Sequence, residues 1–164
     1  MDVSRATVRS AVASFLTPPA VTGLNHVYTA PPKVAPGQDW SLALGKGSGA
    51  VAVIHIEHEH EERIAMGGAT QGWKRVHYNV ALLVRFRSVK PNPVDAMTDY
   101  DTLIDNIKAK LRSDHTLGQQ SGVVFSAGEE DLGITITSDM PVVTNGETHI
   151  WTAVQFTVIE IVQA

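Results

Sequence analysis

Three closely spaced histidines, His55, His58 and His60, are the residues of this sequence best suited to metal chemistry. Imidazole nitrogens bind zinc, nickel and copper, and a His-x-His pair can fill two positions of such a site. A regular strand would direct His58 and His60 to one face and His55 to the other, and a third ligand would have to come from elsewhere, such as His77. The alternative is a polar strand end that faces solvent or another subunit. We predict this alternative, with no metal and no cofactor.

Acidic and basic side chains are concentrated in the same part of the chain. General acid–base catalysis by paired carboxylates is one interpretation, but the adjacent Glu61 and Glu62 diverge in an extended chain. A second interpretation is complementary charge between copies, in which an acidic edge of one subunit meets arginines of the next. A third is a solvated charged face. The predicted interface residues, in contact with another subunit or a larger assembly, are Glu61, Glu62, Arg63, Met66, Trp73, Lys74, Arg75, Arg85 and Arg87.

Glycine-rich segments do not match nucleotide-binding motifs. A phosphate loop needs a glycine before four further residues and then Gly-Lys-Ser/Thr, and the run 45–49 does not match this pattern. A strand, and not the helix that follows a phosphate loop, is predicted after it. Gly67 and Gly68 precede no helix, and no serine has the context of a nucleophile elbow. These residues therefore predict no enzyme.

Hydrophobic periodicity predicts an α+β protein. Alternation over residues 73–89 puts Val76, Tyr78 and Val80 on one face, as expected for an antiparallel strand with one face on a core. The predicted elements are an N-terminal helix at 2–16, strands at 50–60, 73–89, 123–125, 134–137 and 148–162, and a central helix at 93–112. We expect one domain, 1–164, with a largely antiparallel sheet, both amphipathic helices packed on one face, a loop-rich segment at 17–49 and a flexible hairpin tip at 60–73.

Composition narrows the classes of function. The 164 residues carry a formal net charge of −4, which argues against a dedicated nucleic-acid binder. The absence of cysteine excludes disulfides, thiolate zinc sites and cysteine nucleophiles. No apolar run approaches the ~20 residues needed to cross a bilayer, and residues 1–16 do not form a signal peptide. We therefore expect synthesis in the cytoplasm and no membrane partner.

The central part of the chain resembles the tail terminator proteins of long-tailed actinobacterial phages. The resemblance covers residues 50–160. It depends on four segments: the hairpin residues 62–68 and 72–75, the strand end at 85–88, and the helix end with the residues that follow it at 110–118. It implies a structural virion protein whose subunits form a hexameric ring on the last ring of the tail tube. Such a ring stops tube polymerisation, contacts a head-completion or stopper protein, and lets DNA pass through its lumen without reading the base sequence.

Three alternatives remain open from the sequence. A head-closure (stopper) protein or a tube subunit has a similar size and α+β organisation. A small metal-dependent hydrolase would use His55, His58, His60 or His77. A binding module that adds a strand or loop to a partner would remain monomeric at high concentration.

Overall fold

The computed structural model describes residues 5–33, 47–65, 72–118, 124–127 and 133–163. The elements, in chain order, are α1 (Arg5–Leu16), β1 (Leu24–Tyr28), β2 (Gly49–Ala65), β3 (Trp73–Ser88), α2 (Pro93–Ser113), β4 (Val124–Ala127), β5 (Thr135–Ser138), β6 (Val142–Thr144) and β7 (Glu147–Gln163). This arrangement confirms the predicted α+β class.

The seven strands of the described residues belong to one sheet with the order β1-β2-β3-β7-β4. The three long strands β2, β3 and β7 are antiparallel to one another, and β4, β5 and β6 pair with successive parts of the outer edge of β7. Only β1 of the described strands is parallel to its neighbour, β2. The prediction of a largely antiparallel sheet is therefore confirmed.

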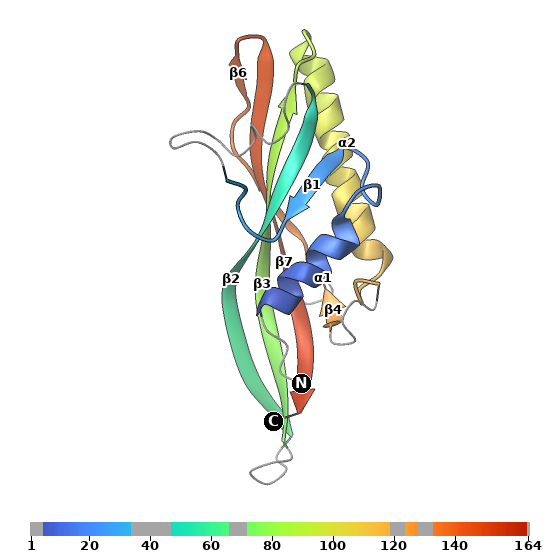
Figure 1. Ribbon diagram of the computed structural model, residues 1–164, viewed down its shortest axis with the longest axis vertical. Helices are drawn as coiled ribbons and strands as arrows, with labels where there is room; N and C mark the ends of the chain where they lie inside the picture. The colour runs from blue at the N-terminus through green and yellow to red at the C-terminus, as the bar shows by residue number, and fades with distance from the viewer. Residues whose placement is uncertain (1–4, 34–46, 66–71, 119–123, 128–132, 164) are drawn as a thin grey trace.

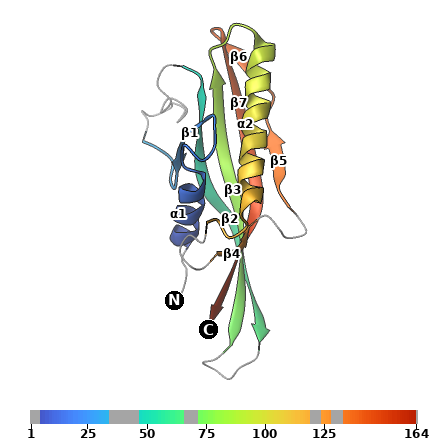
Figure 2. The same cartoon turned by 90° about the vertical axis from the view of Figure 1, so that its right-hand side faces the viewer.

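The two helices pack against the same face of this sheet (Figures 1 and 2). We call this the helix face; no helix in the described ranges covers the opposite, open face. On β3 the helix face carries the predicted alternating set, all of it buried: Val76, Tyr78, Val80, Leu82, Val84 and Phe86. Even-numbered residues of β7 join them, including Ile150, Val154, Phe156 and Val158. Alternation in the sequence thus identified the core side of both strands.

The start of β2 requires a glycine. Gly49 has a φ of +156°, and a Cβ atom at this position would overlap the side chain of Asn25. The Asn25 side chain is held there because its Oδ1 accepts a hydrogen bond from the Ala50 amide at 3.0 Å. Close approach of a neighbouring side chain is a common reason for glycine in a strand.

The central helix α2 has a capped N-terminus, as its sequence predicts. Asn92 has extended backbone angles, and its Oδ1 accepts a hydrogen bond from the Val94 amide at 3.1 Å. Pro93 occupies the first helical position, where its missing amide hydrogen costs nothing. The buried stripe of the helix is Ala96, Tyr100, Leu103, Ile104, Ile107 and Leu111.

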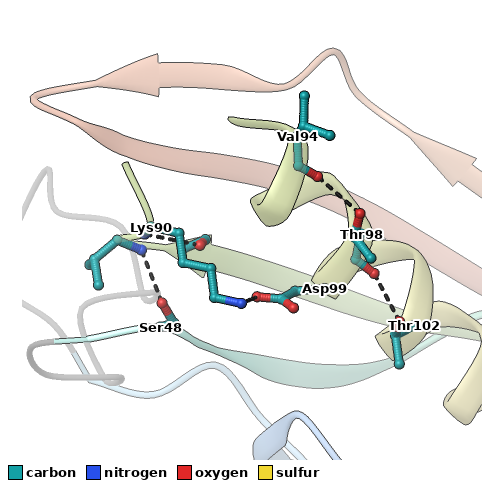
Figure 3. A network of polar contacts seen from close by, with 8 residues as sticks. Ser48, Lys90, Val94, Thr98, Asp99 and Thr102 are labelled. Atoms are coloured by element: carbon teal, nitrogen blue, oxygen red, sulfur yellow. Dashed lines mark hydrogen bonds and ion pairs between the residues drawn. The ribbon is translucent and has the colours of Figure 1, made fainter. Parts of the chain in front are cut away.

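Polar contacts hold the connection between β3 and α2 against the rest of the domain (Figure 3). The Ser48 hydroxyl accepts a hydrogen bond from the Val89 amide at 3.0 Å, which ties the end of β3 to the start of β2. One residue later, the Lys90 ammonium lies 2.6 Å from an Asp99 carboxylate oxygen on α2. The entry into α2 is therefore anchored at three points: the cap, Ser48 and Asp99.

Replacing the cap tests its contribution. Asn92→Ala is expected to lower the free energy of unfolding by about 1 kcal/mol, because the Val94 amide loses its acceptor. Asn92→Asp retains an acceptor and should stay within about 0.5 kcal/mol of the wild type. Urea unfolding followed by circular dichroism measures both, and equal stability of Asn92→Ala and the wild type would contradict this role for the cap.

One long strand, β2, extends further than predicted. It continues to Ala65 instead of ending at residue 60, whereas β3 begins at Trp73 as predicted. The strands persist because β7 pairs with the second edge of β3 over the same stretch, from His77 to Trp73. A third strand satisfies backbone groups that a two-stranded hairpin would leave to solvent. The remaining tip residues, 66–71, lie outside the described residues.

Candidate assembly surface

A three-stranded arm projects from the domain beyond both helices (Figures 1 and 2). It consists of residues 60–65 of β2, 73–77 of β3 and 159–163 of β7. Six of the nine predicted interface residues lie on it: Glu61, Glu62, Arg63, Trp73, Lys74 and Arg75. Met66 lies outside the described residues. The structure therefore brings most of the predicted set together on a single projection.

Charged residues on the arm pair with one another within the chain. The Lys74 ammonium lies 3.5 Å from Glu61, and the Arg75 guanidinium lies 3.0 Å from Glu62. His77 Nε2 is 3.3 Å from the same Glu62 oxygen. The hydrogen bond from His77 and the charge of Arg75 hold the pKa of the Glu62 carboxyl below its ordinary value. Exposed pairs of this kind set strand register more than they stabilise the fold.

Two large apolar side chains are exposed near the end of the arm. Ile64 is the extra residue of a β-bulge between Arg63 and Ala65, and 43% of its surface is exposed. Trp73, at the start of the facing strand, is 44% exposed. An apolar pair surrounded by charged residues is typical of the centre of a protein–protein contact.

Arg85 and Arg87 do not belong to this surface. Both are buried near the other end of β3. The Arg87 Nε–H donates to the Gly47 carbonyl at 2.9 Å, and the Arg85 guanidinium lies over the Trp151 ring. Sequence spacing placed them beside Arg75 on one face, but it gave no sign that neighbouring groups within the chain would bury them.

A second exposed apolar group lies at the opposite end of the molecule, where β6 meets β7 and α2 begins (Figure 1). Its members are Val89, Val94, Met140, Val142 and Val143, and Met140 is 85% exposed. We call this group the far end. This group was not expected from the sequence, because β6 was not among the predicted strands. The signal was Asn145-Gly146, a two-residue hairpin turn in which both residues have positive φ.

The histidines are arranged differently from the regular-strand expectation. Ile56 lies opposite Val80 but His58 lies opposite Asn79, so Glu57 is the extra residue of a bulge. The bulge shifts the alternation by one, which places His58 and His60 on the open face together with His55. The prediction that His55 lies on the other face is therefore wrong. Within the described residues, no group of three or more His, Cys, Asp or Glu side chains is arranged to hold a metal ion.

A hollow of about 420 Å³ lies between β1 and α2. Its polar lining includes Asn25, Ser48, Asp99 and Asn106, while Phe86 and Leu103 supply part of the apolar wall. Asp99 is paired with Lys90, and the Asn106 side chain donates to the Thr22 carbonyl at 3.2 Å. These polar groups are engaged in holding the fold, so the hollow gives no support to a catalytic role.

Comparisons with known proteins leave the family open. A scan against protein-family models and a search of curated proteins returned no match. Among solved structures, one similar chain comes from the "Virion of native gene transfer agent (GTA) particle", with 11% sequence identity and a TM-score of 0.29 over 96% of this chain and 99% of that chain. A TM-score of this size does not establish a shared fold. No helix in the described part of the chain is long and apolar enough to span a membrane.

Proposed function

We propose that this chain is a structural virion protein, a tail terminator whose subunits assemble into a hexameric ring at the end of the tail tube. The observation that carries the proposal is the presence of unlike exposed apolar groups at opposite ends of the molecule: the arm end with Ile64 and Trp73, and the far end. A subunit of a closed ring contacts its two neighbouring subunits through two different patches. A ring that lies between a tail tube and a head connector also needs a different surface for each of these two partners. The resemblance of residues 50–160 to tail terminators points in the same direction.

In this proposal the arm end contacts the tail tube or the adjacent subunit. The internal ion pairs Glu61–Lys74 and Glu62–Arg75 set the register of the arm, and the apolar pair supplies most of the contact energy. The far end is then available to a head-completion or stopper protein. DNA passes through the lumen without sequence-specific binding, in accordance with the net charge of −4.

Assembly of the untagged chain tests the proposal. Light scattering over a range of concentrations should show either a mass near six times 17.7 kDa, or a smaller species that forms rings once purified tail tubes are added. The double variant Ile64→Ser/Trp73→Ser should retain the wild-type circular dichroism spectrum. Its association constant for assembly should fall by at least about 10-fold, as expected for the loss of two central apolar contacts. A matched control is Leu83→Ser, which changes an exposed aliphatic residue of β3 on the open face, away from both ends.

The possible outcomes separate the alternatives. A wild-type monomer at all concentrations that ignores tail tubes would contradict the proposal. Rings that bind head connectors but not tubes would favour the head-closure alternative. Assembly unaffected by the double variant would show that the arm end is not the contact.

A further inference from the structure

Two histidines of the arm face each other across adjacent strands. His60 of β2 lies directly opposite His77 of β3, and their ring centroids are 6.2 Å apart with an angle of 42° between the planes. Both side chains lie on the open face, where His60 is exposed and His77 is half-buried. His77 was already a candidate partner of the histidine cluster from the sequence, but its direct pairing with His60 depends on the bulge at Glu57 and on the hairpin register.

Hydrogen bonding determines which nitrogen of His77 is available. A carboxylate such as that of Glu62 only accepts hydrogen bonds. The 3.3 Å contact between its Oε1 and His77 Nε2 therefore places a proton on Nε2. In the neutral ring the lone pair is then on Nδ1. A carboxylate that holds one ring nitrogen while the other binds a metal is the usual second shell of a metal-binding histidine.

We propose that His60 and His77 form a cross-strand chelate for a late first-row divalent cation such as Zn²⁺ or Ni²⁺, with Glu62 as a positioning residue. Imidazole pairs favour these ions over Mg²⁺ and Ca²⁺, which prefer oxygen ligands. At Zn–N distances of about 2.0–2.1 Å, two coordinated rings have centroids roughly 5 Å apart. The observed separation of 6.2 Å thus needs a movement of about 1 Å, which the exposed His60 can supply by side-chain rotation.

The surroundings of the pair are compatible with such an ion. The charge of Arg75 is compensated by Glu62, at 3.0 Å. From β7, the residues on the same face opposite His77 and Arg75 are Ile159 and Ile161, which carry no charge. His58 lies on the same face of β2 but opposite Asn79, so the proposed pair supplies two protein ligands and water completes the coordination. A bound ion would join β2 to β3 at the base of the arm and reduce its local opening.

Zinc titration of the untagged full-length chain tests the site. Isothermal titration calorimetry should show one ion per chain, with affinity at least about 10-fold weaker in His60→Ala and in His77→Ala. Glu62→Gln should weaken binding by roughly 10-fold, as positioning residues do. The matched control is His55→Ala: His55 is an exposed histidine of the same strand and face, but it lies on the other side of the bulge, opposite Ala81, and its loss should leave the affinity unchanged.

Hydrogen exchange provides a readout independent of affinity. Zinc should slow exchange of the arm amides at 60–63 and 74–77 in the wild type, and should have no such effect in His77→Ala. Zinc binding only at millimolar concentration, or binding that survives both His60→Ala and His77→Ala, would overturn the proposal. Because both positions are on the arm surface, circular dichroism should confirm that the variants fold. If His77→Ala does not fold, His77→Gln replaces it in both experiments.

Discussion

Leu82→Ala is expected to lower the free energy of unfolding by about 3–5 kcal/mol. Leu82 is 0% exposed and lies at the centre of the sheet, between Ile54 of β2 and Val154 of β7. All three side chains belong to the core beneath the helices. The substitution removes buried apolar surface and leaves a cavity that the flanking strands cannot close, so the transfer and cavity costs add. Denaturant unfolding measures the loss.

The adjacent residue provides a matched control. Leu83 has the same side chain on the same strand but points to the open face, where it is 36% exposed. It lies between Val53 and Ala153, so Leu83→Ala should cost less than about 1.5 kcal/mol. Similar losses for the two variants would mean that the two faces of the sheet are equally buried, and would contradict the arrangement of both helices on one side.

Tyr78→Phe is expected to destabilise the protein by about 1–3 kcal/mol. Tyr78 and Glu160 are both buried on the helix face, and the phenol donates a hydrogen bond to the Glu160 carboxylate at 3.1 Å. Removing the hydroxyl withdraws a hydrogen-bond donor from a buried carboxylate, and the loss of a hydrogen bond to a buried charged group is costly. Tyr28→Phe, in the half-buried edge strand β1, is the control and should change stability by less than about 0.5 kcal/mol.

The same pair predicts a dependence on alkaline pH. Burial, followed by the charge of Glu160, raises the pKa of Tyr78 above its ordinary value of 10.0. The folded state therefore keeps the phenol protonated where the unfolded state ionises. The contribution of the protonated Tyr78 phenol to the free energy of unfolding is complete below pH 10 and is lost as the pH rises above that value. Between pH 9 and pH 11, the free energy of unfolding should decline less for Tyr78→Phe than for the wild type. Equal declines in the two proteins would exclude this linkage between Tyr78 ionisation and stability.

Local sequence signals determined most of the elements. Alternation of apolar residues identified the core face of β3, since side chains of a strand point to opposite sides at every step. Asn92, Pro93 and the apolar stripe identified α2, because capping and helical periodicity act within a few residues of one another. The α+β class followed from these elements.

Only the tertiary structure decided how the strands pair, because pairing depends on residues far apart in the chain. One extra residue, Glu57, moved His58 and His60 to the open face, and no local pattern announces such a bulge. Pairing of β3 with β7 lengthened the arm, and folding buried Arg85 and Arg87 away from it. The juxtaposition of His60 with His77, and of Tyr78 with Glu160 across 82 residues, likewise arises from strand register, which is set by long-range packing rather than by local propensity.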